Sequence, residues 1–205
     1  MVSSFVSSLV GEVQLKKETI PALLVGHWEL LYIDEDITRA SPFFWAFRKA
    51  FKDVEDPFKL LGPTLLSESI FKITDDIPFK EIGECKQDFT ANGELISKVE
   101  VIAKLPFDSS SSRMTTTSYW ATTQENDIIE VRVEKTQVLD STIGKLVKSS
   151  PFSFLNTEFP FPSGPALELI KAGSSTVYIK VLYIDEEIRI CKNVQDDKLL
   201  IFKRL

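Results

Sequence analysis

Apolar and polar residues alternate along most of the chain after Gly26. The alternation is clearest at residues 127–138, where Ile129, Val131 and Val133 are separated by charged side chains. A period of two is typical of a strand that buries one face and exposes the other. We expect nine strands on this basis, at residues 26–33, 64–74, 80–90, 94–105, 113–123, 127–138, 175–184, 187–193 and 198–204.

Short turn sequences separate several of these strands. Asn92 and Gly93 can adopt the positive φ angles of a tight hairpin, and Glu125 with Asn126 also favours a turn. Tight turns make neighbouring strands pair antiparallel. Many short strands joined in this way predict an all-β protein whose sheet closes, or nearly closes, into a barrel of about eight or nine strands.

The first residues follow a helical spacing instead. Apolar side chains recur every three or four residues from Val2 to Val13, and serines occupy the other side. The pattern predicts an amphipathic helix, while a Ser-rich stretch of this kind is also typical of the remnant of a targeting sequence. Both interpretations stay open. We expect residues 1–25 to form an N-terminal helix and linker, and residues 26–205 to form the barrel domain.

Two connections, at residues 34–63 and 139–174, are much longer than ordinary hairpin loops. Both are rich in aromatic residues, which suggests that they cover the barrel. If consecutive strands run up and down, the connection after the first strand and the one after the sixth leave from opposite ends. We therefore expect one connection to form a lid and the other to plug the far end, with helix confined to the early part of the chain.

A helix signal lies in the first of these connections, at residues 41–55. Ser41 can cap its N-terminus, and Pro42 suits the first helical position. The apolar residues of the segment fall on one broad face at helical spacing. We expect this face to form a helical lid between the first two strands, and its principal side chains are Phe44, Phe47 and Phe51.

Trp45 falls on the opposite, charged face of the predicted helix, near Arg48 and Lys49. An indole beside cations is typical of a helix that contacts a lipid surface or a partner. These three residues are therefore candidates for lipid-surface contact. The alternative is that Trp45 stacks under Arg48 or packs against a neighbouring loop.

Inward side chains of the predicted strands are candidates for a ligand cavity. The apolar candidates are Val99, Val101, Val131 and Val133, and Tyr119 is a candidate polar group among them. Residues 113–123 also carry several hydroxyl side chains, which would suit an oxygen-bearing ligand if they faced inward. Alternation leaves their direction open, because both faces of this strand are mixed.

Trp28 near the start of the first strand is a candidate for closing one end of the barrel. Small ligand-binding barrels often place a Trp there, with an Arg from a late strand over its face. Arg189 is the candidate partner, because it lies between Ile188 and Ile190, where an unpaired charge would be costly. We interpret the pair as structural rather than reactive.

Composition excludes several classes of protein. The 205 residues carry a net charge of −6 with scattered basic residues, so no nucleic-acid partner is expected. Cys85 and Cys191 are too few and too far apart for a metal cluster or a disulfide framework. His27 is the sole histidine and belongs to no triad motif, and no phosphate-binding glycine loop is present. We expect no cofactor and no catalytic activity.

Five motifs stand out beyond these patterns: G-H-W-E-L-L-Y at 26–32, S-P-F-F-W-A-F at 41–47, K-Q-D-F-T-A-N-G at 86–93, F-P-F-P-S at 159–163 and Y-I-D-E-E-I-R-I at 183–190. Together they resemble the plastid-lipid-associated protein family, also called plastid fibrillins. The resemblance covers most of the chain, and its last motif is the most specific. I-D-E-D follows the first motif at 33–36, where the family usually has a short Thr/Ser segment.

The resemblance implies a lipocalin-like barrel in the plastid, or chloroplast, associated with plastoglobules or thylakoids and with lipids, carotenoids or prenylquinones. It implies no catalytic residues. Our first hypothesis is a non-enzymatic barrel that binds such a hydrophobic molecule and docks on a lipid surface. The second is a scaffold that recruits enzymes of lipid or quinone synthesis and has no small-molecule cavity.

Overall fold

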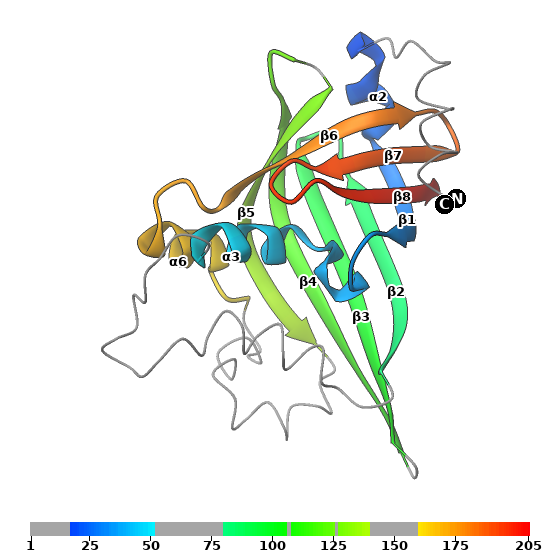
Figure 1. Ribbon diagram of the computed structural model, residues 1–205, viewed down its shortest axis with the longest axis vertical. Coiled ribbons are helices and arrows are strands. Elements are labelled where there is room, and N and C mark those ends of the chain that lie inside the picture. Colours follow the sequence, from blue (N-terminus) through cyan, green and yellow to red (C-terminus); the bar gives the residue numbers. More distant parts are fainter. Residues whose placement is uncertain (1–16, 52–79, 106–107, 126, 140–159) are drawn as a thin grey trace.

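Eight strands in the described part of the chain form one closed antiparallel barrel, shown in the computed structural model of Figure 1. The structure describes residues 17–51, 80–105, 108–125, 127–139 and 160–205. The strands are β1 (Gly26–Ile33), β2 (Lys80–Phe89), β3 (Glu94–Leu105), β4 (Asp108–Thr122), β5 (Ile128–Leu139), β6 (Thr176–Ile184), β7 (Ile188–Asn193) and β8 (Lys198–Arg204). Each strand pairs with the next, and β8 pairs with β1. The predicted all-β, lipocalin-like barrel is confirmed.

The strand bounds agree closely with the alternation in the sequence. β1, β3 and β8 begin and end at the predicted residues. β4 begins at Asp108 rather than at residue 113, because its first residues include a run of serines at 109–112 that pairs with β3 without an apolar alternation. The predicted strand at 64–74 and the predicted helix over residues 2–13 lie outside the described residues.

Alternate side chains of the strands contribute to the main core of the barrel, while Ile190 on β7 and Leu199 on β8 belong to a second, smaller cluster. On β6, for example, Val177, Ile179 and Val181 are buried. The register between β4 and β5 shifts between Thr117 and Ser118. Such a bulge increases the local twist, which helps a sheet to curl towards closure.

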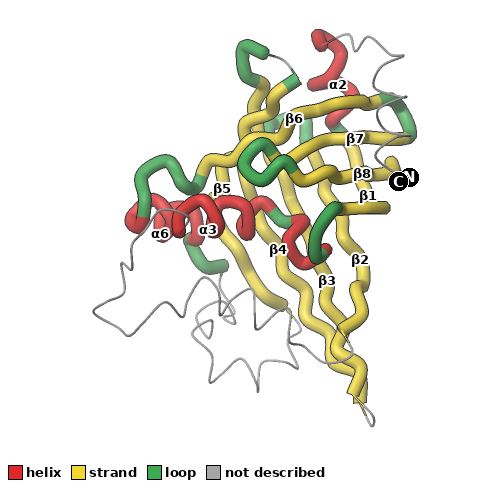
Figure 2. Tube along the Cα trace, viewed as in Figure 1, coloured by secondary structure: helices red, strands yellow, loops and turns green. Residues whose placement is uncertain are grey.

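Short helices cover the barrel at two places (Figure 2). The 3-10 helix η1 (Lys17–Thr19) and helix α2 (Ile20–Leu24) precede β1. The 3-10 helix η2 (Ile37–Ala40) and helix α3 (Pro42–Phe51) follow β1, and helix α6 (Ser163–Ile170) lies between β5 and β6. The predicted lid helix thus forms α3, with Ser41 as its cap: the Phe43 amide donates to Ser41 Oγ at 3.4 Å.

Helix α6 corrects the expectation that helix is confined to the early part of the chain. Its sequence contains Gly164 and Pro165 and follows Pro162, which are residues typical of loops. The segment packs closely on the barrel, because a Cβ at Gly164 would clash with the carbonyl oxygen of Val133. The glycine lets the start of α6 lie directly against β5.

The two long connections leave the same end of the barrel, and the expectation of opposite ends is wrong. Figures 1 and 2 both show α3 and α6 side by side, and α3 contacts α6, β5 and β6. The reason is the number of strands between the two connections, because strand direction alternates around an antiparallel barrel. In the closed barrel β5 runs in the same direction as β1, so both strands end at one rim. The expectation counted residues 64–74 as a further strand, which reversed the direction of every later strand.

Candidate functional site

Trp28 closes the barrel next to α2. Its indole is fully buried, and its Nε1 donates to the Leu24 carbonyl at 2.8 Å. Two guanidinium groups lie near its ring: that of Arg189 is 5.1 Å and that of Arg204 is 4.4 Å from the ring centroid. The predicted contact between Trp28 and Arg189 is therefore present, and Arg204 is a second cation that the sequence did not single out.

Arg204 connects the last strand to the segment before the first. Its Nη1 donates to the Val25 carbonyl at 2.9 Å, and its Nη2 donates to the Leu23 carbonyl. Gly26 has a φ of 144°, and a Cβ there would lie 2.4 Å from Arg204 Nη1. Glycine is thus needed for both the backbone conformation and the space. No pattern around Arg204 signals this role, because it follows Lys203 at the end of the chain like an ordinary basic surface pair.

Arg189 lies inside the barrel, with only 1% of its surface exposed. Its guanidinium carbon is 4.0 Å from the ring centroid of Phe202 and 4.9 Å from that of Phe89. Its Nη2 donates to Gln87 Oε1 at 2.6 Å, while its Nε and Nη1 have no hydrogen-bond partner among the described residues. Burial disfavours the charged form and lowers the pKa of Arg189 to about 10.

A row of polar side chains crosses the inner wall of the barrel. Gln87, Ser97, Thr116 and Thr136 are directly paired from one strand to the next on β2, β3, β4 and β5. All four are buried. We call these four residues the polar row. Gln87 Nε2 extends the row towards η2 by donating to the Ala40 carbonyl at 3.4 Å.

The polar row continues as a chain of hydroxyl groups into the covering helices. Ser41 Oγ lies 2.9 Å from Thr116 Oγ1, which lies 3.4 Å from Thr136 Oγ1. Thr136 Oγ1 in turn lies 2.9 Å from the Ser163 hydroxyl at the start of α6. Hydrogen bonds thus fix the N-terminal ends of both α3 and α6 to the inner wall.

Two buried hydroxyls on the inner wall have no such partner. Ser97 Oγ on β3 and Ser118 Oγ on β4 make no hydrogen bond to any residue that the structure describes. Both serines are fully buried. The direction of the hydroxyls on residues 113–123, which alternation left open, is therefore resolved: Thr116 and Ser118 face inward.

Tyr119 faces outward, and its prediction as a polar group of the cavity is wrong. Its side chain is 45% exposed, and Arg132 lies 5.9 Å from the ring centroid. The negative charge of Glu134 raises the pKa of the Tyr119 hydroxyl. Since Thr116 and Ser118 occupy the inward positions of β4, the residue that follows Ser118 necessarily points to solvent.

The predicted apolar wall is present where the side chains are described. Val99, Val131 and Val133 are all buried and belong to the main hydrophobic core. The side chain of Val101 lies outside the described part of the structure. These valines lie on β3 and β5, on either side of the hydroxyls that β4 presents.

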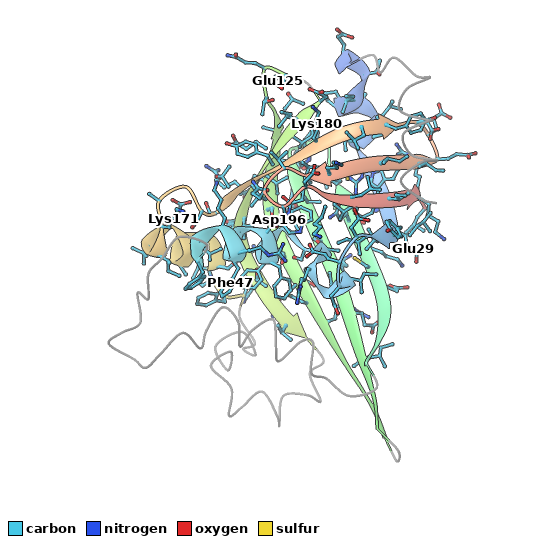
Figure 3. The ribbon with its side chains drawn as sticks, in the orientation of Figure 1. Glu29, Phe47, Glu125, Lys171, Lys180 and Asp196 are labelled. Atoms are coloured by element: carbon cyan, nitrogen blue, oxygen red, sulfur yellow. The ribbon has the colours of Figure 1, made fainter. Side chains whose placement is uncertain are left out.

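The phenylalanines of α3 form a stack along the helix. Phe44 and Phe47 are buried and Phe51 is half-buried. The ring centroids of Phe47 and Phe51 are 4.5 Å apart, and those of Phe43 and Phe47 are 5.9 Å apart. Figure 3 labels Phe47 on α3. The three predicted lid residues are thus placed together on one helix that covers the barrel.

Trp45 is not on the surface, so its prediction as a lipid contact is wrong. Only 1% of its surface is exposed, and its Nε1 donates to the Arg39 carbonyl at 2.7 Å. The alternative of packing against a neighbouring segment is the one that the structure shows. Helical spacing placed Trp45 on the polar face, but η2 folds back over that face and covers the indole.

Arg48 and Lys49 are also engaged within the protein. Arg48 forms ion pairs with Glu35 at 2.9 Å and with Asp196 at 2.5 Å, and Figure 3 shows Asp196 close to α3. Lys49 Nζ donates to the carbonyls of Gly173 at 2.8 Å and Thr176 at 2.7 Å. Desolvation lowers the pKa of Lys49. Both cations fasten α3 to the rim of the barrel, so the predicted lipid-contact cluster does not form.

Other chemistry is sparse in the described residues. His27 lies on the outer face, with Nδ1 2.8 Å from Asp88 Oδ1. Among the described side chains, no group of three His, Cys, Asp or Glu residues is placed to hold a metal ion. No helix within the described ranges has the length and apolar character needed to cross a membrane. A scan against protein-family models and a search of the curated proteins both find no match for the chain.

Proposed function

We propose that the protein is a non-enzymatic barrel that holds a hydrophobic small molecule in its interior. The observation that carries the proposal is an apolar inner wall interrupted by the buried hydroxyls of Ser97 and Ser118, which have no hydrogen-bond partner in the described part of the chain. Buried polar groups without partners are rare in folded proteins and call for an explanation. A bound molecule with an apolar body and an oxygen-bearing group would satisfy them.

The fold supports this proposal through its two differently built ends. Trp28 and Arg204 seal one end with hydrogen bonds to the backbone of residues before β1. Phe44 and Phe47 cover the other end from a helix that is held by side-chain contacts. A barrel with one fixed end and one helical cover is suited to retaining an apolar guest, because burial of apolar surface contributes roughly 25 cal/mol per Å² before ordering costs.

The identity of the guest and the location of the protein rest on the resemblance of the sequence. Similarity to plastid-lipid-associated proteins supports a prenylquinone, a carotenoid or a lipid as the guest. It also supports a place in the plastid, on plastoglobules or thylakoids. Trp45, Arg48 and Lys49 take no part in the proposed association with a lipid surface, because all three are engaged inside the molecule.

Native mass spectrometry of the full chain purified from plastids tests the proposal. A co-purifying hydrophobic molecule is expected, and its mass would identify the class. Val131→Phe is expected to reduce the bound fraction by filling the interior, whereas Arg132→Gln on the outer face of the same strand is the matched control. A chain that carries no small molecule and binds no lipophilic probe would contradict the proposal. That result would favour a scaffold that recruits biosynthetic enzymes.

A further inference from the structure

Four polar atoms inside the barrel have no hydrogen-bond partner among the residues that the structure describes, and each of them can donate a hydrogen bond. They are Arg189 Nε, Arg189 Nη1, Ser97 Oγ and Ser118 Oγ. The side chains that carry them are buried to 99% or more. A guanidinium has no acceptor capacity, and a hydroxyl can act as a donor towards any oxygen. Arg189 therefore supplies two donors without an acceptor among the described residues, and the two hydroxyls can each donate to a bound oxygen.

The strand register brings these donors to one region of the inner wall. Gln87, which accepts from Arg189, is directly paired with Ser97 on the next strand. Ser97 is paired with Thr116, so Ser118 is its diagonal neighbour on the same face. Diagonal neighbours across an antiparallel pair lie about 7–8 Å apart. Ser97 thus lies between Gln87 and Ser118.

The charge of Arg189 is also unbalanced. None of the carboxylates in the described residues forms an ion pair with it. Its contacts include Gln87 and the rings of Trp28, Phe89 and Phe202, and the Cys85 and Cys191 thiols lie close enough to interact with its charge. Aromatic faces attract a cation but supply no anion. A buried charge that is not paired is costly, and natural proteins retain one mainly where it has a task.

Comparison with Arg204 shows that closure of the barrel does not require Arg189 to be arranged in this way. Arg204 contacts the same indole and uses both terminal nitrogens on backbone carbonyls, which ties the barrel end together. Arg189 binds no backbone group, and two of its three nitrogens remain available. The two arginines therefore differ in degree: within the described residues Arg204 leaves only Nε without a partner, whereas Arg189 leaves both Nε and Nη1.

We propose that the guest of the barrel carries an acidic oxygen group, with Arg189 as its cationic partner and Ser97 and Ser118 as further donors. This inference rests on the function proposed above and, of the guests named there, selects an acidic lipid over a prenylquinone or a carotenoid, which carry no carboxylate or phosphate. The acidic group is a carboxylate or a phosphate on an apolar chain, since both present several acceptor oxygens to a guanidinium. The valines on β3 and β5 would contact the chain.

The test compares three probes on the full-length protein: a long-chain fatty acid, its methyl ester and an alkyl phosphate of equal chain length. We expect the acid or the phosphate to bind at least about tenfold more tightly than the ester, as for hydrogen bonds to a charged group. Arg189→Met should reduce the affinity for the charged probe to that for the ester. The stronger of the two charged probes identifies the head group.

A second variant keeps the test independent of Arg189, whose loss leaves Gln87 without its partner. The double substitution Ser97→Ala and Ser118→Ala should weaken binding of the charged probe by about three- to tenfold and binding of the ester by less, because a hydrogen bond to a charged group contributes more than one to a neutral carbonyl. Ser174→Ala is the matched control. Ser174 is a buried serine that lies outside the barrel and donates to the Leu167 carbonyl, so this change should alter neither affinity.

Each outcome is decisive. Equal binding of acid, phosphate and ester would overturn the acidic head group while leaving a hydrophobic guest in place, with ordered water as the partner of the buried donors. Failure of all three probes to bind would overturn the proposed function as well. A preference for the charged probe that survives Arg189→Met would assign the charge recognition to another residue.

NMR of a carboxyl-labelled fatty acid adds a direct measurement of the same contact. Next to Arg189 the bound carboxylate should stay ionised below the pH at which the free acid titrates.

Discussion

At the residue scale, the surroundings of Trp28 show that two arginines next to one indole ring can have different roles. Arg189 and Arg204 both lie against Trp28, yet one is buried among rings and the other is bonded to the backbone. The sequence pointed to Arg189, because its apolar neighbours made a charge conspicuous. It gave no sign of Arg204, because the carbonyls that Arg204 binds come from the far end of the chain. Contacts of that kind depend on closure of the sheet.

Arg204→Met should lower the free energy of unfolding by about 1–3 kcal/mol, because the carbonyls of Leu23 and Val25 lose their donor. Urea unfolding measures the change. Lys203→Met is the neighbouring control: its partner Glu29 lies on the outer face, and an exposed ion pair contributes less than about 1 kcal/mol. Equal losses from the two variants would show that Arg204 does not hold α2 to the barrel.

Trp45 is the residue for which helical spacing was most misleading. Trp45→Ala should lower the free energy of unfolding by about 3–5 kcal/mol, because a buried indole is replaced by a cavity. Thermal unfolding and urea unfolding both measure it. If the substitution left stability unchanged and reduced flotation with liposomes instead, the indole would have to be exposed in solution.

At the scale of elements, the strands and the lid helix α3 were predictable, and helix α6 was not. Period-two alternation is a local property, so β1, β3 and β8 could be bounded from the sequence alone. Helix α6 depends on contacts made after folding: Gly164 rests on the Val133 carbonyl, and Ser163 bonds to Thr136. The inward valines followed from alternation, whereas the inward hydroxyls of β4 required the observed register, because Thr and Ser occupy both of its faces.

The attachment of α6 should depend on pH through Glu168. The carboxylate accepts hydrogen bonds from the Ser175 hydroxyl and from the Gly173 amide, at 2.7 Å for the latter, and these bonds lower the pKa of Glu168. A lowered pKa means that the carboxylate stabilises the fold above its ordinary pKa of 4.5 and loses that effect as the pH falls through the folded value.

Glu168→Gln should therefore unfold at lower urea concentration than the unmodified protein at neutral pH, and the difference should shrink in acid. Urea titrations at neutral pH and at several values below 4.5 measure it. Glu186→Gln, in the exposed turn before β7, is the control and should show no such convergence. If the difference in the urea midpoint between the two proteins stayed constant across the whole pH range, the hydrogen bonds of Glu168 would not depend on its charge.

At the scale of the whole molecule, closure makes the eight described strands one cooperative unit. Every strand has two neighbours, so no strand can separate without breaking two ladders. Closure was predictable from the number of strands and the short turns. The placement of the two long connections was not predictable. The end at which a connection leaves the barrel depends on the number of strands before it, and one additional strand in the count changes that end.

The two cysteines can report this cooperativity. Cys85 on β2 and Cys191 on β7 are buried free thiols, and burial raises the pKa of Cys85 to about 12. In single-cysteine variants carrying Cys85→Ser or Cys191→Ser, the remaining thiol should react with a labelling reagent only on global unfolding. The protection free energies of the two thiols should then agree with each other and with urea unfolding. Much faster labelling of either thiol would reveal local opening at its strand.

The shared rim of the two long connections has a consequence for how this protein can diversify. Since α3 and α6 touch each other, a change of length or shape in one connection alters the surroundings of the other. Substitutions in the two regions should therefore be epistatic, although more than a hundred positions separate them along the polypeptide. The rim beneath α3 and α6 can therefore change shape through either connection, while the contacts of Trp28 and Arg204 at the other end of the barrel stay as they are.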